Sequence, residues 1–473
     1  MFNYSFWADE AYIAGIALQL ITGKISFQAA LDTSGVFYQK IYMLMLALSL
    51  KIFGFSEFAA RVPSIFFYAI GIAVIFLLVK KIANVYAAIL STFFYAFSHL
   101  NLAYATQAKP YIIIELLTLL VLFLIVYTSQ KPKKMSLLLS HAIIIFLTSS
   151  ALLVHNIGIF LWVLYGAYLV SKLTTIKINK RVFVLSIPII LVLTFIAYKF
   201  IYPVILSFIF LLFKEGQLFP YNHAYQVAKL FGFKYFFLTA CAVLGYLGVF
   251  KKNIAPLISL AVYSTVLLFM VAFEFYTFNI RYVLSLFGIL FAFSGIGLAN
   301  IIKVFFPRQV LLGTMLAILL IYVSGYKISR IPQAYYNPNV DKYGDIQIAN
   351  YKDFYTKLKQ NFPNYRKFVI VNDTHDVEYW YMRHYSSAYF TKFVKKPYRH
   401  QTGKAMVYGS LVDFKKFIVK HPRGLLIMED WESFLPEDIK QYAKENLKLE
   451  FRVESLKEAP EDPWPLALYS WGL

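Results

Sequence analysis

PYIIIELLTLLVLFLIVYTS, residues 110–129, is a stretch of twenty residues that contains one charged side chain, Glu115. At a helical rise of about 1.5 Å per residue, the stretch reaches about 30 Å, which is the thickness of the hydrocarbon core of a bilayer. It therefore predicts a transmembrane helix, with Glu115 about one turn inside it.

Similar apolar runs recur as far as residue 326. Of the 473 residues, 59% are hydrophobic and 19% aromatic, and the mean hydropathy is +0.60, which excludes a soluble globular protein. Ten runs predict crossings, at 60–79, 84–99, 110–129, 135–153, 156–172, 182–203, 234–250, 255–273, 281–301 and 309–326. A shorter run, Tyr38 to Gly54, would reach only about 24 Å. It is either a surface helix or a further crossing.

The basic residues gather in alternate connections between these runs. One set of connections carries thirteen of them: Lys80, Lys81, Lys131, Lys133, Lys134, Lys172, Lys177, Lys180, Arg181, Lys251, Lys252, Lys303 and Arg308. The other set carries Lys109, Lys214, Lys229 and Arg281. By the positive-inside rule the first set is cytoplasmic, and the second set lies on the extracytoplasmic side together with the tail. The net charge of +21 therefore indicates membrane lipids as partners, and no nucleic acid.

Three segments follow from this pattern. Residues 1–57 form an outer juxtamembrane segment that contains one or two surface helices, the first over Asp9 to Ile21. Residues 58–326 form an all-α polytopic membrane domain of about ten spans. Residues 327–473 form a small extracytoplasmic α/β domain. Within that domain the sequence predicts strands at 367–371, 405–408 and 424–428 and helices at 409–420 and 436–446.

Asp9 and Glu10 are adjacent carboxylates beside a membrane. A carboxylate partly shielded from water at the lipid edge is a candidate general base. Acidic residues in a first turn also complement the helix dipole, so a helix start explains the pair equally well.

Four cations stand out on the predicted outer side: Lys40, Arg61, Lys109 and Arg281. Three of them share one property, since each is a cation at an outer helix end, where it would meet the phosphate of a lipid carrier. The commoner reason for a basic residue at such a position is snorkelling to the headgroups. For Arg61, a salt bridge to Glu57 four residues earlier is a further explanation.

Other polar features carry less chemistry. His155-Asn156 would orient a substrate or serve only as a hydrogen-bonded loop, and the connection from Lys214 to Lys229 fits either a sugar contact or an aromatic belt. The single cysteine, Cys241, excludes a disulfide framework and a Cys-built metal site. No set of metal ligands, phosphate-binding loop or hydrolase motif appears.

The order of these motifs resembles the GT-C glycosyltransferases. Asp9-Glu10 precedes Phe-Tyr-Gln-Lys at 37–40, then FGFSEFAARVPS at 53–64, Lys-Pro-Tyr at 109–111, His-Asn at 155–156 and Arg-Tyr at 281–282. Within that class the order is similar to the dolichyl-phosphate-mannose protein mannosyltransferases, a group that includes the lipid A aminoarabinose transferase. The resemblance covers about residues 1–326.

The resemblance implies an inverting transfer of a sugar from a polyprenyl-phosphate donor to a protein, lipid or glycan acceptor, on the outer face of the plasma membrane. Asp9 matches the catalytic acid of the family, with Glu10 as a supporting carboxylate. The donor phosphate would be bound by Lys40, Arg281, Tyr282 and Arg61, with Lys109, Tyr111, His155 and Asn156 as pocket candidates. The cofactor is left open between none and a divalent cation.

Three departures from the family pattern stand out. Only eight residues precede Asp9, where the family has a first crossing, so the start is misassigned, the chain is a fragment, or this helix is lacking. Ile41 follows Lys40, where many relatives have proline. Lys109 replaces an arginine and loses its bidentate geometry. A lipid-linked sugar translocase and a non-catalytic membrane scaffold are the alternative functions.

Overall fold

The computed structural model describes residues 5–6, 8–33, 39–130, 134–173, 221–275, 278–323, 334–337, 342–345, 349–373, 377–400, 404–429, 434–455 and 465–473. The chain divides into two compact units. Ser64–Tyr343 forms one unit, which we call the bundle. Met1–Pro63 and Gly344–Leu473 together form the other, which we call the sheet unit. The predicted first and third segments therefore share one unit.

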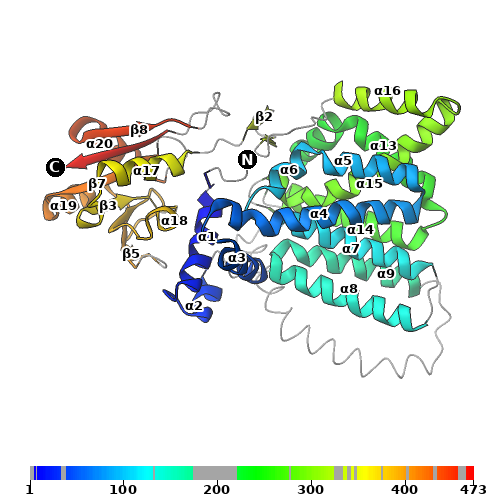
Figure 1. Ribbon diagram of the computed structural model, residues 1–473, viewed down its shortest axis with the longest axis horizontal. Coiled ribbons are helices and arrows are strands. Elements are labelled where there is room, and N and C mark those ends of the chain that lie inside the picture. The colour runs from blue at the N-terminus through cyan, green and yellow to red at the C-terminus, as the bar shows by residue number, and fades with distance from the viewer. Residues whose placement is uncertain are drawn as a thin grey trace. The chain divides into compact units, whose positions relative to one another are not determined.

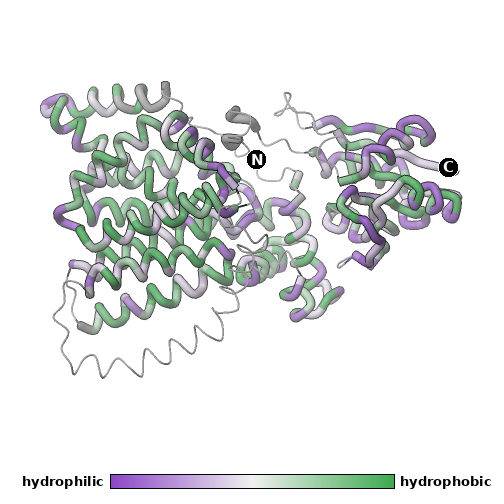
Figure 2. The backbone as a smooth tube through the Cα atoms, turned by 180° about the vertical axis from the view of Figure 1, so that it is seen from behind, coloured by the Kyte–Doolittle hydropathy of each residue, from purple (hydrophilic) through white to green (hydrophobic). Residues whose placement is uncertain are grey.

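The bundle is built mainly from helices that coincide with the predicted apolar runs. Its elements are α4 (Glu57–Ile82, which begins in the sheet unit), α5 (Val85–Ala96), α6 (His99–Ala105), α7 (Tyr111–Ser129), α8 (Lys134–Val154), η1 (Asn156–Ile159), α9 (Phe160–Leu173), α12 (Ala224–Ala228), η3 (Lys229–Lys234), α13 (Phe236–Phe250), α14 (Ile254–Phe273), η4 (Ile280–Val283), α15 (Leu284–Phe305), α16 (Val310–Val323), β1 (Ala334–Asn337) and β2 (Lys342–Asp345). Figure 1 shows α7, α9, α14 and α15 side by side, and Figure 2 shows apolar residues along most of their length.

All nine predicted runs that fall on described residues form helices. Among the described residues, five helices are long and apolar enough to cross a membrane, or six if 224–234 and 236–250 form one bent span. Helices α5, α9 and α16 are shorter. Helix α3 (Lys40–Phe53) is also shorter, and it covers the run from Tyr38 to Gly54 that the sequence predicts as either a surface helix or a crossing. The predicted crossing at 182–203 lies outside the described residues. A polytopic, mostly helical membrane domain is thus confirmed.

Helix α15 is the centre of the bundle because small residues let its neighbours approach closely. A Cβ atom on Gly297 would overlap the carbonyl oxygen of Cys241 on α13, and one on Gly245 would overlap that of Phe293 on α15. Close approach through small residues is the usual way in which helices associate in lipid, where no hydrophobic driving force acts between them.

Hydrogen bonds from serine reinforce these contacts. Ser91 Oγ on α5 donates to Ala292 O at 2.8 Å, and Ser294 Oγ on α15 donates to Leu238 O at 2.7 Å. Helix α15 is therefore tied to α5 and α13 by side-chain bonds as well as by packing.

Described residues of the lysine-rich connections lie at one end of the bundle (Figure 1), namely Lys81, Lys172, Lys251 and Lys252. Lys81 Nζ, at the end of α4, lies 5.2 Å from the ring centroid of Tyr127 near the end of α7. Ser129 at the end of α7, Lys172 at the end of α9 and Asn253 before α14 line one cavity. The alternation of charge predicted from the sequence thus corresponds to two ends of one helical domain.

The sheet unit combines the amino-terminal helices with the tail. Its elements are α1 (Ala8–Ile21), α2 (Phe27–Asp32), α3, α17 (Tyr351–Asn361), η5 (Tyr365–Lys367), β3 (Val369–Asn372), α18 (Glu378–Met382), β4 (Ala388–Phe390), β5 (Tyr398–Arg399), β6 (Met406–Tyr408), α19 (Leu411–Lys420), β7 (Gly424–Glu429), α20 (Glu437–Asn446), β8 (Lys448–Val453) and β9 (Leu466–Trp471). All five elements predicted in the tail are present, within one to two residues.

Seven strands form one mixed sheet in the order β5-β6-β4-β3-β7-β9-β8. The central strands β6, β4, β3 and β7 are parallel, whereas β5, β9 and β8 pair antiparallel. Helices α19 and α20 pack on the sheet through a core that includes Phe414, Ile439, Phe390, Leu426 and Trp471. Helix α17 packs against α18 and against β8 and β9.

Helix α1 is buried along most of its length, although the sequence predicts a helix that lies on a bilayer surface. It packs against α3 and α18, so its neighbours are protein on two sides. Phe6 N donates to Tyr381 Oη at 2.9 Å, and Gln19 Nε2 donates to Tyr385 Oη at 2.6 Å. These bonds to the tail explain why the two ends of the chain form one unit.

We expect Gly297→Leu to destabilise the bundle by about 1–3 kcal/mol or more, because its side chain must displace the backbone of α13. Gly232→Leu is the matched control, because a Cβ atom there meets no atom within 4 Å. Thermal unfolding of the purified proteins in detergent measures the difference. Equal melting temperatures for the two variants would contradict the close approach of α13 and α15.

Candidate active site

The two adjacent carboxylates of α1 have different surroundings. Glu10 is buried and forms a forked ion pair with Arg61, with Nε–Oε1 at 3.1 Å and Nη2–Oε2 at 3.2 Å. Asp9, in the same first turn, is exposed. Since a carboxylate engaged by a guanidinium fork has both oxygens occupied, Glu10 is suited to holding structure.

Arg61 is completely buried, and the amino-terminal segment surrounds it. Its Nη2 also donates to Ser5 O at 3.2 Å, and its guanidinium lies 5.0 Å from the ring centroid of Phe6. The sequence spacing suggests Glu57 as its partner, but the structure pairs Arg61 with Glu10. Glu57 instead meets Lys352 of α17 at 3.3 Å. A contact between Arg61 and a donor phosphate stays a prediction.

Lys40 is half-buried at the first residue of α3, which packs against α1. The sheet unit therefore places Asp9, Glu10 and Lys40 on two contacting helices, with Arg61 near the start of α4. Of these sequence-predicted site residues, the structure shows Glu10 and Arg61 in direct contact.

In the bundle, Arg281 is held by its backbone and by two aromatic rings. Asn279 Oδ1 accepts the Arg281 N–H at 3.1 Å and caps η4. The guanidinium lies 5.7 Å from the ring centroid of Tyr111 and 5.1 Å from that of Tyr282, and its Nη2 donates to Tyr282 Oη at 3.2 Å. Cation–π contacts of this kind fix the direction of the charge without neutralising it.

His155 completes this group as a neutral imidazole. Its ring lies 5.0 Å from that of Tyr111, and its Nδ1 accepts the Ile157 N–H at 3.2 Å. Burial lowers the pKa of His155 to about 3, and the positive charge of Arg281 adds to the shift. Because Nδ1 is an acceptor, the ring proton lies on Nε2, which is left as a donor. Beside it in the chain, Asn156 Oδ1 is buried without a hydrogen-bond partner among the described residues.

Lys109 is buried just before α7, where Ser64 Oγ donates to its carbonyl oxygen at 3.0 Å. The turn at Pro110 then begins α7 at Tyr111. The bundle thus brings Tyr111, His155, Arg281 and Tyr282 into one group, and the turn places Lys109 beside it in the chain.

Three residues that the sequence did not single out support these groups. Asn279 caps η4 and so positions Arg281. Asn101 on α6 donates through Nδ2 to Oε1 of Glu115 at 3.4 Å, and Glu115 is buried in α7. Tyr381 bonds the amino-terminal segment. Of these three residues, only Tyr381 has a signal in the sequence, which is the aromatic run Tyr379 to Tyr381. Asn279 and Asn101 have no local sequence signature. Among the described residues, no group of three or more His, Cys, Asp or Glu side chains is placed to hold a metal ion.

Comparison with known proteins agrees with this architecture. Residues 41–202 match the family model of the dolichyl-phosphate-mannose-protein mannosyltransferases. The crystal structure of ArnT from Cupriavidus metallidurans in the apo state matches with a TM-score of 0.62 at 12% identity, covering 99% of this chain and 94% of that chain. The form bound to undecaprenyl phosphate matches with a TM-score of 0.59 at 11% identity and the same coverage.

The apo oligosaccharyltransferase of Archaeoglobus fulgidus matches with a TM-score of 0.49 at 12% identity, covering 79% of this chain and 60% of that chain. No curated protein matches the sequence at a significant level. The chain has the fold of ArnT. The family match over residues 41–202 and the likeness to ArnT agree with the resemblance found in the sequence.

We expect Arg61→Met or Glu10→Leu alone to destabilise the protein by about 3–5 kcal/mol, because each leaves a buried charge without its partner. The double variant Glu10→Leu/Arg61→Met should recover most of the loss. Lys448→Ala, which removes an exposed partner of Glu450, is the control and should cost less than about 1 kcal/mol. Denaturant unfolding of wild type and the four variants measures the coupling, and additive losses in the double variant would contradict it.

Proposed function

We propose that this protein transfers a sugar from a polyprenyl-phosphate donor to an acceptor hydroxyl, with inversion, on the extracytoplasmic side of the membrane. The observation that carries the proposal is Arg281, a cation held between two aromatic rings at a helix end in a chain with the fold of ArnT. The ArnT structure bound to undecaprenyl phosphate supports a polyprenyl phosphate as the carrier.

The proposed reaction is a single displacement. Asp9 takes the proton of the acceptor hydroxyl, the hydroxyl oxygen bonds to the anomeric carbon, and the bond from that carbon to the carrier phosphate oxygen breaks. The pairing of Glu10 with Arg61 and the exposure of Asp9 support Asp9 as the base. Proton transfer by a positioned carboxylate is typically worth about 10²–10⁴-fold in rate.

The departing phosphate carries the charge that develops in this reaction. Arg281 is proposed as its main contact, with Tyr282 and Lys40 as further contacts. A guanidinium fixed before the reaction costs no reorganisation when the charge appears, which is the basis of electrostatic stabilisation of a transition state. His155 Nε2 and the buried Asn156 Oδ1 are proposed to bind hydroxyl groups of the sugar or acceptor.

The extracytoplasmic side is proposed from the charge of the connections. The lysine-rich end of the bundle is opposite to the end with His155 and Arg281, since α9 runs from one to the other. By the positive-inside rule, the lysine-rich end faces the cytoplasm.

We expect Asp9→Asn to lower sugar transfer by about 10²–10⁴-fold while the protein folds normally, because the amide cannot accept the proton. The assay uses membranes that contain the protein and labelled polyprenyl-phosphate sugars. Asp32→Asn, an exposed aspartate at the end of α2, is the matched control and should leave transfer unchanged. Equal transfer by Asp9→Asn and wild type would refute the assignment of the base. Lack of transfer from any donor by wild type would favour a translocase.

We expect Arg281→Lys to lower transfer by about 10²–10³-fold, although the charge is kept, because lysine loses the planar group that the rings of Tyr111 and Tyr282 fix. Lys303→Arg, at the lysine-rich end, is the control for a basic exchange. Steady-state rates against donor concentration separate kcat from KM. Wild-type rates for Arg281→Lys would show that only the net charge at this position matters.

A further inference from the structure

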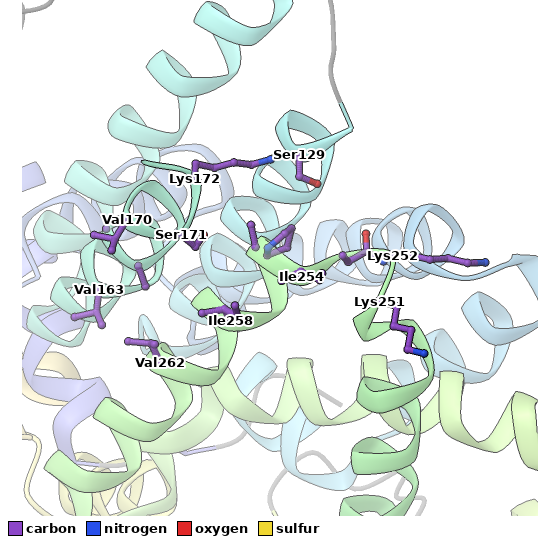
Figure 3. A pocket seen from close by; sticks show the side chains of 15 residues that line it. Ser129, Val163, Val170, Ser171, Lys172, Lys251, Lys252, Ile254, Ile258 and Val262 are labelled. Carbon is purple, nitrogen blue, oxygen red and sulfur yellow. The ribbon is translucent and has the colours of Figure 1, made fainter. Parts of the chain in front are cut away.

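A cavity of about 920 Å³ lies between α9 and α14 at the lysine-rich end of the bundle (Figure 3). Its wall is mostly apolar and includes Val163, Gly166, Val170, Ile258 and Val262. The volume falls within the roughly 300–1,000 Å³ of small-molecule sites. The cavity is therefore large enough to receive part of a lipid.

The cavity also carries a concentration of positive charge. Among the described residues that line it, three are lysines and none is an acid. Lys172 is in the last turn of α9, whereas Lys251 and Lys252 precede α14, as Figure 3 shows. The twenty-residue helix α14 begins at this point, so the positive end of its dipole adds to the charge of the side chains.

A molecule that binds in this cavity must match both its apolar wall and its positive charge. Val170 and Ile254 on the wall are exposed, so the apolar part of the cavity is open at the side. In a membrane, hydrocarbon chains are the surroundings of such a surface. A basic pocket between transmembrane helices on the lysine-rich side is a recognised way of binding an anionic headgroup. An anionic phospholipid combines the chain and the charge.

The site is distinct from the proposed catalytic groups. Helix α9 begins close to His155 and ends at Lys172, and α14 begins beside Lys252 and ends before Arg281. Fourteen and twenty helical residues correspond to about 21 and 30 Å. A lipid at the lysines therefore lies at the opposite end of the same two helices.

We propose that this cavity binds an anionic phospholipid, with an acyl chain between α9 and α14 and the phosphate at Lys172, Lys251 and Lys252. The site is a lipid site additional to that of the sugar donor, and it does not depend on the proposed reaction.

The test is native mass spectrometry of the full chain, released from detergent in the presence of phosphatidylglycerol or phosphatidylcholine with the same acyl chains. We expect phosphatidylglycerol to bind more tightly to wild type. The triple variant Lys172→Gln/Lys251→Gln/Lys252→Gln should weaken phosphatidylglycerol binding on the order of a hundredfold, since each basic residue near a headgroup contributes about fivefold.

Two variants separate the cavity from charge in general. Lys80→Gln/Lys303→Gln/Arg308→Gln removes the same charge from connections at the same end that do not line the cavity, and binding should stay within about twofold. Gly166→Leu fills the cavity without a clash, because a Cβ atom at Gly166 meets no atom within 4 Å. It should weaken phosphatidylglycerol binding at least tenfold while the melting temperature stays near that of wild type.

Three results would overturn the proposal: equal binding of the two lipids by wild type, equal losses in the two triple variants, or wild-type binding by Gly166→Leu. Inorganic phosphate serves as a competitor. If inorganic phosphate alone binds as tightly as phosphatidylglycerol, the cavity binds free phosphate, the acyl chain contributes nothing, and the lipid proposal is overturned as well.

Discussion

The cost of placing a charge in hydrocarbon determines where this protein keeps its ionisable groups. A charged side chain at the middle of a bilayer costs several kcal/mol, whereas one at a helix end reaches water or headgroups. The bundle follows this constraint: Lys172, Lys251 and Lys252 lie at one end of α9 and α14, and His155 and Arg281 at the other. Glu115 is inside α7, but it is buried in protein and accepts a hydrogen bond from Asn101. The bundle therefore has a lysine end and an end with His155 and Arg281, because charged side chains are kept out of the middle of its helices.

The same cost explains the buried pair in the sheet unit. Arg61 and Glu10 are both inaccessible, and each is the other's charged partner at 3.1 Å. A buried pair adds little stability compared with apolar side chains, but it defines geometry, since only one arrangement satisfies both ions. Here that arrangement ties the first turn of α1 to Arg61 near the start of α4, in the same turn as the exposed Asp9.

Hydrophobic runs and turn residues predicted most of the elements, because such signals are local. The nine described apolar runs became helices, and the strand β7 and the helix α20 were visible as short patterns. Three of the seven strands of the sheet were predicted, namely β3, β6 and β7, whereas β4, β5, β8 and β9 were not. Strands β8 and β9 join the sheet by antiparallel pairing. Interaction partners that lie far apart in the chain were also missed, because such a pairing leaves no local signal in the sequence. The spacing of four residues suggested Glu57 for Arg61, whereas the observed partner is 51 residues away. The neutrality of His155 likewise follows from its burial, which its place between two apolar runs does not reveal.

The two ends of the bundle also use cations of different kinds, and the difference bears on what each end can do. Arg281 is planar and is fixed by Tyr111, Tyr282 and the cap of Asn279, so its charge has a defined direction before any substrate arrives. Such preorganisation is what stabilisation of a developing charge requires. Lys251 and Lys252 are exposed on flexible stems, and an ammonium group acts as a point charge with no preferred plane. They suit a headgroup whose position varies, because they lose little by following it. A catalytic role at the arginine end and a binding role at the lysine end are therefore consistent with the physics of the two side chains, and exchange of the two residue types would impair both.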